Sequence, residues 1–293
     1  MVRVNNMSRI EKAIEKAVKL RDSKISDEPK SKGLIDKTDE YQSKTGIRKE
    51  TISNLAEINI VSPYIITVNE PDSPISEEYR NLKSMIVRLT RQKGFQNTLM
   101  ITSALSGEGK SITALNLAAT LSQEYDYTVL LIDADIRRPF LHTYLNIKPE
   151  IGLSDCLIKG LDVGSALLKT NIGKLSFLPA GMNVENPAEL LSSNKMKELL
   201  GEIKQRYSDR YIIIDTPPIL PFAETRSIST AVDGVIFVVK EGMASLQSIR
   251  DALELLKNSN ILGIVYNDVS IGSLDGHDYS YYGDRVYKYK TGI

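Results

Sequence analysis

The sequence predicts an α/β fold in which helices cover both faces of a mostly parallel β-sheet. From residue 97 onward, short apolar or β-branched segments alternate with stretches of helical periodicity, and this alternation is typical of parallel sheets. A glycine-containing loop at residues 103–111 follows the first such segment and opens a helix, which is the setting of a phosphate-binding loop. We expect an N-terminal helical and flexible arm before this sheet and a flexible tyrosine-rich tail after it.

Composition narrows the class of protein. Of the 293 residues, 37 are Lys or Arg and 37 are Asp or Glu, and this balance argues against a nucleic-acid partner. One cysteine, Cys156, excludes an intrachain disulfide framework. No apolar run approaches the ~20 residues of a membrane helix, and the first residues lack an apolar signal core. We expect a cytoplasmic enzyme or switch protein.

Three regions are expected along the chain. Residues 1–74 would form the arm, with an amphipathic helix at 8–21 and a charged linker at 22–56. That helix would either dock on a partner or fold back on the domain. The folded domain is expected over residues 75–269, and the tail over residues 270–293.

A further amphipathic helix is predicted over residues 76–91, with Ser76 as its cap. Glu77, Arg80 and Lys83 recur every third residue and therefore lie along one side of it. A solvated helix face is the usual explanation of such charges. The alternative is a subunit contact, because Arg and Glu can pair across an interface.

Six strands are predicted in the domain, and helical periodicity lies between most of them. The strands cover residues 98–102, 128–132, 174–178, 211–214, 234–239 and 261–266. The clearest helices between them cover residues 111–124 and 245–257. Because the apolar runs are nearly unbroken, we expect strands that are buried on both faces.

The loop at residues 103–111 predicts a P-loop NTPase-like nucleotide site. Gly107 and Gly109 would let backbone amides turn toward phosphate oxygens, and the helix N-terminus adds a partial positive charge. Lys110 would reach the β- and γ-phosphates, and Ser111 would ligate Mg²⁺. The expected nucleotide contacts are Ser106, Gly107, Glu108, Gly109, Lys110, Ser111 and Ile112. Ala104 replaces the first glycine of the general pattern, so the loop is a variant.

Three aspartates end two of the predicted strands, where open α/β sheets bind their ligands. Asp133 and Asp135 follow one strand, and Asp215 ends another. We expect Asp135 and Asp215, together with Ser111, to hold the Mg²⁺ of a bound nucleotide. The sequence lacks a guanine-recognition motif, which favours ATP over GTP. Asn267 follows the last strand and would either contact the base or form a turn.

With these motifs in view, the chain from about residue 75 resembles the bacterial tyrosine kinases, which are autokinases of capsule and exopolysaccharide synthesis. The resemblance rests on residues 103–111, on Ile-Asp-Ala-Asp-Ile-Arg-Arg-Pro at 132–139 with His142, and on the short motifs at 152–155, 178–181, 186–192 and 215–218. Glu77, Arg80 and Lys83 resemble the family's ExxRxxR oligomerisation helix, with Lys for the last Arg. The N-terminal residues resemble the exosortase-associated subgroup.

The tail carries five of the chain's 14 tyrosines within eleven residues: Tyr279, Tyr281, Tyr282, Tyr287 and Tyr289. We interpret them as phosphoacceptors, and a sticky or disordered tail is the alternative. A phenol has a pKa of ~10 and needs a base at neutral pH, so we expect Asp133 to take its proton. Lys110 would stabilise charge on the phosphates, and Arg137 or Arg138 would hold the acceptor segment or a neighbouring subunit.

The resemblance also implies partners. It implies a homo-oligomeric ring in which one subunit's tail enters the next subunit's site. It further implies a transmembrane polysaccharide co-polymerase that activates the kinase and holds it at the inner membrane. The competing interpretations are a positioning-type ATPase switch without protein phosphorylation and a nucleotide-binding scaffold. The positioning ATPases carry a lysine at the position of Leu105, and its absence here argues against them.

Overall fold

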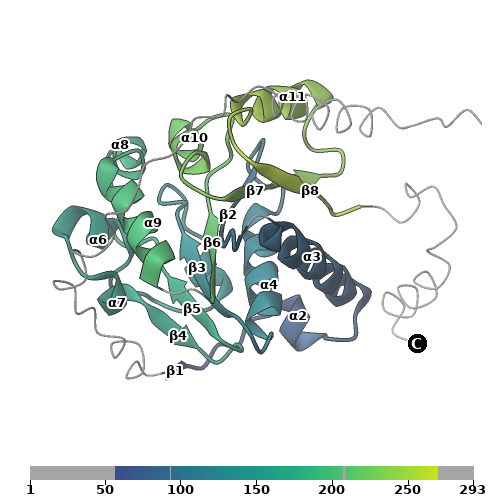
Figure 1. Cartoon of the computed structure of the whole chain (residues 1–293), viewed down its shortest axis with the longest axis horizontal. Helices are drawn as coiled ribbons and strands as arrows, with labels where there is room; N and C mark the ends of the chain where they lie inside the picture. Colours follow the sequence, from purple (N-terminus) through teal and green to yellow (C-terminus); the bar gives the residue numbers. More distant parts are fainter. Residues whose placement is uncertain (1–56, 93, 207–208, 270–293) are drawn as a thin grey trace, which may run out of the picture. The chain divides into compact units, whose positions relative to one another are not determined.

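The computed structural model describes residues 57–92, 94–206 and 209–269, which contain an eight-stranded sheet (Figure 1). The strand order is β1-β4-β5-β3-β6-β2-β7-β8, and every neighbouring pair is parallel except β4 and β5. The strands are β1 (Glu57–Ile58), β2 (Thr98–Ser103), β3 (Thr128–Asp133), β4 (Leu168–Thr170), β5 (Leu175–Leu178), β6 (Arg210–Asp215), β7 (Gly234–Lys240) and β8 (Ile261–Asn267). The expected mostly parallel sheet is therefore confirmed.

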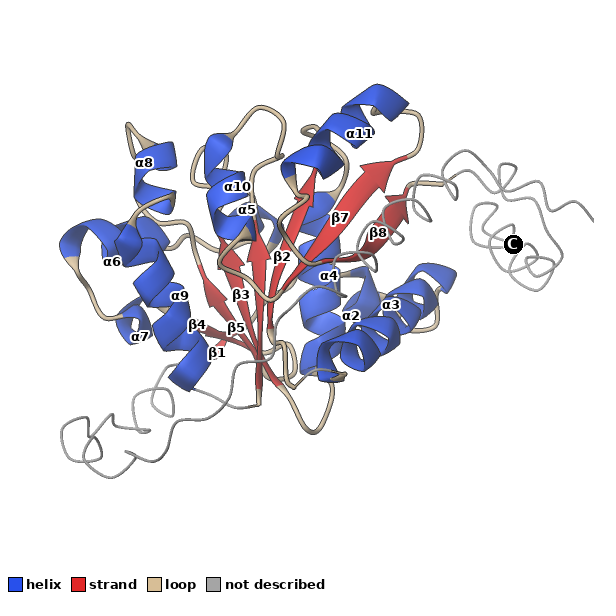
Figure 2. Cartoon of the chain, turned by 45° about the horizontal axis from the view of Figure 1, so that its top comes forward, coloured by secondary structure: helices blue, strands red, loops and turns tan. Residues whose placement is uncertain are grey.

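Helices lie on both sides of the sheet (Figure 2). They are α2 (Ile66–Asn69), α3 (Pro74–Arg91), α4 (Lys110–Ser122), α5 (Leu141–Tyr144), α6 (Leu153–Lys159), α7 (Val163–Ala166), α8 (Pro187–Leu191), α9 (Asn194–Arg206), α10 (Ala223–Ser229) and α11 (Leu246–Leu255). Among the described residues, no helix is both long enough and apolar enough to span a membrane.

Each central strand contributes side chains to two hydrophobic cores, because successive side chains of a strand point to opposite faces. In β2, Leu99 and Ile101 pack with α3 and α4, whereas Met100 packs with the helices of the other face. All six residues of β2 and of β6 are buried. This double burial explains why these strands appear in the sequence as unbroken apolar runs.

The start of the folded region differs from the predicted boundary at residue 75. β1 pairs with β4, and Ile65, ahead of α2, is buried in the core shared by α3 and α4. The predicted cap of the second amphipathic helix is also wrong. Ser73 is the N-cap of α3, and its side chain accepts a hydrogen bond from the Ser76 amide. Pro74 at the first helical position explains the earlier start, because its fixed φ suits that position.

Several predictions concern parts of the chain outside the described residues. The amphipathic helix at 8–21 and the charged linker at 22–56 lie there, and so do the five tail tyrosines between 279 and 289.

Candidate active site

The phosphate-binding loop connects β2 to α4 and depends on two glycines in the left-handed region. Gly107 has φ 88° and Gly109 has φ 91°, a conformation that side chains with a Cβ rarely adopt. A Cβ at Gly109 would also lie 2.1 Å from the side-chain nitrogen of Asn267. Gly109 is followed directly by Lys110, the first residue of α4, so the free amides of the helix start face the loop.

Asn267, at the end of β8, holds this loop from the side. Its Nδ2 donates a hydrogen bond of 3.0 Å to the backbone oxygen of Glu108. The sequence placed Asn267 beside the base or in a turn, and the structure adds a contact that neither alternative included. Residues 108 and 267 are far apart in sequence, so no local pattern could have indicated the pair.

Glu108 supports the loop from inside. The residue is fully buried, and its Oε2 accepts a hydrogen bond of 2.6 Å from the Leu105 amide. Burial raises the pKa of its carboxyl above the usual range, and backbone donors including Leu105 partly oppose the rise. Ser106 and Gly107 are exposed at the loop tip, whereas Glu108 faces the protein. Its side chain is therefore placed to shape the loop.

Lys110 and the aspartates meet at one edge of the sheet, as the sequence predicts. β3 and β6 are neighbours, and Asp133 and Asp215 are register partners at their carboxyl ends. The Nζ of Lys110 lies 2.9 Å from Oδ2 of Asp135 and 3.6 Å from Oδ1 of Asp215. It also donates a hydrogen bond of 3.1 Å to Oγ of Ser111.

Burial and mutual repulsion disfavour the charged forms of the carboxyl groups in this cluster. Asp133 is fully buried, and burial together with Asp215 and Asp135 raises the pKa of its carboxyl well above its usual value. Burial also raises the pKa of Asp215, although Lys110 opposes this rise. Burial lowers the pKa of Lys110, but the attraction of Asp215 and Asp135 outweighs burial and raises it overall. One lysine thus faces three buried carboxyl groups.

These residues fit a Mg²⁺-nucleotide. Among the described residues, no donor completes a hydrogen bond to Oδ1 of Asp215, which leaves a buried oxygen available for a metal-bound water. The described part of the chain holds no preformed metal cage of three or more His, Cys, Asp or Glu residues. Mg²⁺ ordinarily uses one or two carboxylates plus phosphates and waters, so such a cage is not needed. Asp135, Asp215 and Ser111 are the residues suited to hold it.

Beside this cluster, an ion pair joins the loop after β3 to the start of α10. Nε of Arg137 lies 2.5 Å from Oε1 of Glu224, and the Arg137 guanidinium sits 4.9 Å from the centre of the Phe222 ring. The side chain of Glu224 is buried, whereas that of Arg137 is partly exposed. The sequence predicted that Arg137 or Arg138 would hold the acceptor segment or a neighbouring subunit, and it did not indicate the pairing of Arg137 with Glu224.

The three charged residues proposed for subunit contact lie on α3. Arg80 and Glu77 form an ion pair within the helix, with both side chains about 41% exposed. Lys83 pairs with Glu124, just beyond α4, and therefore links the two helices. The charges thus have partners within the chain, and Glu77 and Arg80 keep substantial exposure for further contacts.

Comparison with known proteins identifies the family and the fold of the chain. A family model described as an AAA domain matches residues 96–262. The tyrosine-protein kinase YwqD of Bacillus subtilis (strain 168) is 37% identical over 225 residues, covering 75% of this chain and 92% of YwqD. The succinoglycan biosynthesis transport protein ExoP of Rhizobium meliloti (strain 1021) is 32% identical over 232 residues, covering 78% of this chain and 29% of ExoP. The kinase domain of Escherichia coli tyrosine kinase ETK has 25% identity and a TM-score of 0.67, covering 79% of this chain and 98% of that domain.

The chain spans nearly the whole of YwqD but less than a third of ExoP. YwqD and ETK are both named tyrosine kinases, which favours a kinase over a positioning ATPase. The motifs at residues 103–111, 132–139 and 215–218, which carried the resemblance, lie in the loop and strand ends that build the site. This protein belongs to the bacterial tyrosine-protein kinase family, on an AAA-type nucleotide-binding domain.

Proposed function

We propose that the chain is an ATP-dependent protein-tyrosine autokinase that phosphorylates tyrosines of its own C-terminal tail. The observation that carries this proposal is the cluster of Lys110 with Asp133, Asp135 and Asp215 beside a phosphate-binding loop. The same chain ends in five closely spaced tyrosines, and its relatives YwqD and ETK are named tyrosine kinases.

In the proposed reaction, a tail phenol attacks the γ-phosphorus of ATP. The new bond joins the phenolic oxygen to phosphorus, the bond to the β,γ-bridging oxygen breaks, and ADP leaves. Asp133 takes the phenolic proton, because a carboxylate with a raised pKa is a stronger base than an ordinary one. Lys110 neutralises charge on the phosphates from the start of α4. Mg²⁺, held by Ser111, Asp135 and Asp215, would neutralise further phosphate charge.

The remaining proposals concern partners. Glu77, Arg80 and Lys83 would join subunits into a homo-oligomer in which a tail enters a neighbouring site. A transmembrane polysaccharide co-polymerase would activate the kinase and hold it at the cytoplasmic side of the inner membrane. Support for the polysaccharide connection comes from ExoP, which is named a succinoglycan biosynthesis transport protein.

The first test is the intact mass of the purified full-length chain before and after Mg-ATP. Wild type is expected to gain steps of about 80 Da per phosphate, mapping to residues 279–289. Lys110→Met should gain none, because the cation that stabilises the transferred phosphate is lost. Lys197→Met, which changes an exposed lysine of α9 remote from the loop in sequence, is the matched control and should behave like wild type. ATP hydrolysis without any mass step, even with a co-polymerase's cytoplasmic segment added, would support a positioning ATPase instead.

A further inference from the structure

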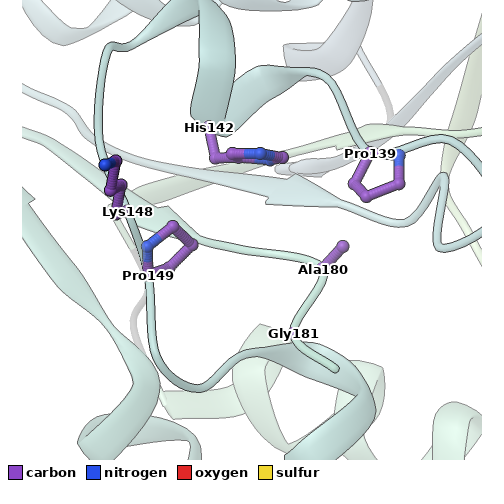
Figure 3. Close-up of a pocket in the computed structure, with 6 residues that line it drawn as sticks. All are labelled: Pro139, His142, Lys148, Pro149, Ala180 and Gly181. Carbon is purple, nitrogen blue, oxygen red and sulfur yellow. The ribbon is translucent and has the colours of Figure 1, made fainter. Parts of the chain in front are cut away.

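A cavity of about 260 Å³ lies beside the carboxyl ends of β3 and β5 and shares no lining residue with the Lys110 cluster. It is lined by Pro139, His142, Lys148, Pro149, Ala180 and Gly181. Figure 3 shows His142 over one side, the two proline rings flanking it, and Ala180 and Gly181 on the opposite side. Neither the nucleotide site nor the proposed transfer step uses any of these side chains.

The wall of this cavity is preformed. Gly181 has φ +89°, and a Cβ there would lie 2.6 Å from Oδ2 of Asp155. That carboxylate accepts hydrogen bonds from the amides of Gly152 and Met182, and it pairs with Lys159 at 2.7 Å. The negative charge behind the wall is therefore compensated. The lining itself holds no acidic side chain, and its polar side chains are His142 and Lys148.

The cavity shares a structural element with the catalytic cluster. Leu141, which lies between the lining residues Pro139 and His142, donates its amide to Oδ2 of Asp133 at 3.3 Å. One short segment of chain thus borders both places. The segment that lines the cavity therefore also contacts the proposed base. This arrangement would let one peptide occupy both places with two of its residues.

Size and chemistry define the ligand. The volume is below the ~300–1,000 Å³ of pockets for drug-sized molecules, and it suits a single side chain. Proline rings and an alanine offer apolar surface to an aromatic ring, whereas lysine and histidine suit an anion. A phosphorylated tyrosine combines a ring with an anion of about −1.5 to −2 charge.

We propose that this cavity binds a phosphotyrosine of the C-terminal tail after transfer, an inference that rests on the proposed autokinase function. The spacing of the tail supports this, since five tyrosines lie within eleven residues. A phosphorylated residue held here keeps the tail at the site while a nearby tyrosine reaches Asp133. The cavity would thereby promote several phosphorylations per encounter.

Binding of synthetic peptides to the full-length chain tests the cavity directly. A labelled peptide of residues 275–291, with or without phosphate on Tyr282, is titrated against Lys110→Met, which cannot modify it. The phosphopeptide should bind at least tenfold more tightly than the plain peptide. Adding Lys148→Ala or His142→Ala should remove most of that difference, because each deletes a charge-assisted contact. Adding Lys197→Ala, an exposed lysine on α9, should change nothing.

Equal phosphopeptide affinity in the Lys148→Ala and Lys197→Ala proteins would overturn the inference. A second readout separates it from the proposed function. In a time course of intact mass, Lys148→Ala should accumulate singly phosphorylated chain, whereas wild type should pass quickly to higher states. If wild type phosphorylates its tail and Lys148→Ala changes neither affinity nor this distribution, only the cavity inference fails. If no transfer occurs but phosphopeptide affinity depends on Lys148, the autokinase proposal fails and the cavity remains a phosphotyrosine site.

Discussion

The two ends of the central strands bury opposite kinds of side chains. At the carboxyl ends, Asp133 and Asp215 are buried next to Lys110. At the amino ends, Tyr211 is buried with its ring about 5.0 Å from the rings of both Tyr127 and Phe95, in edge-on geometry. The same strands thus carry a cluster that opposes folding at one end and a cluster that supports it at the other.

The difference lies in how each end satisfies its polar atoms. The hydroxyl of Tyr211 hydrogen-bonds to Oγ1 of Thr90 at 2.8 Å, so the aromatic end buries a polar atom with a partner. The carboxyl end keeps like charges together, and Lys110 approaches Oδ1 of Asp215 only to 3.6 Å, so this oxygen accepts no hydrogen bond among the described residues. Buried like charges of this kind are typical of catalytic sites, where groups needed for activity lower the stability of the fold.

The largest expected effect comes from Asp133→Asn. Removing a general base should slow tail phosphorylation by about 10²–10⁴-fold. In wild type, the transfer rate should rise with pH until Asp133 is ionised at its raised pKa. Quantitative mass spectrometry of the tail across pH measures both effects. An Asp133→Asn protein that transfers phosphate at the wild-type rate would remove Asp133 from the mechanism.

The same variant also probes stability. Because the folded state raises the pKa of Asp133, its stabilising contribution is complete below the unfolded value of ~3.9 and is lost as pH rises through the folded value. The Tm of Asp133→Asn minus that of wild type should therefore grow as pH rises from acidic to neutral. A difference that is independent of pH would show that the carboxyl carries no such penalty.

At the other end, Tyr211→Ala should destabilise the fold by about 3–5 kcal/mol, as expected for a large aromatic side chain lost from a core. Tyr211→Phe keeps the ring and should lose only about 1 kcal/mol, for the hydrogen bond to Thr90. Denaturant unfolding measures both values. Tyr125→Ala is the control, since this residue is 93% exposed. If Tyr211→Phe slows phosphorylation in the folded protein, the aromatic end of the strands does not act on stability alone.

The smallest expected effect concerns Lys83 on α3. Lys83→Ala removes the ion pair with Glu124, which is partly exposed, so the loss of stability should be about 0.5 kcal/mol or less. Glu124→Ala breaks the same pair but leaves Lys83 in place. Sedimentation of both proteins separates the roles. If Lys83 contacts another subunit, only Lys83→Ala should shift the oligomer to smaller species, and an equal shift in both would leave the ion pair as the cause.

The local sequence pattern was sufficient to predict the buried strands and the phosphate-binding loop. All six predicted strands are present, with ends that differ by a residue or so, because burial on both faces leaves apolar runs. β1 and β4 were missed, since strands of two or three residues are set by their pairing rather than by periodicity. The contacts of Arg137 with Glu224 and of Asn267 with Glu108 were also missed, because they join residues 87 and 159 positions apart.

The hydrogen bond from Asn267 fixes the end of β8 at the phosphate-binding loop. The number of residues between Asn267 and each tail tyrosine therefore limits how far that tyrosine can lie from the loop. Tyr279 is about 12 residues and Tyr289 about 22 residues beyond this fixed point, and chains of these lengths can span at most about 40 Å and 75 Å respectively. In a flexible chain, the free-energy cost of loop closure grows only with the logarithm of length, so closure over about 22 residues would cost only about 0.5 kcal/mol more than closure over about 12. The length of this connection therefore discriminates weakly among the five acceptors, and any strict order of phosphorylation must come from side-chain recognition at the sites themselves.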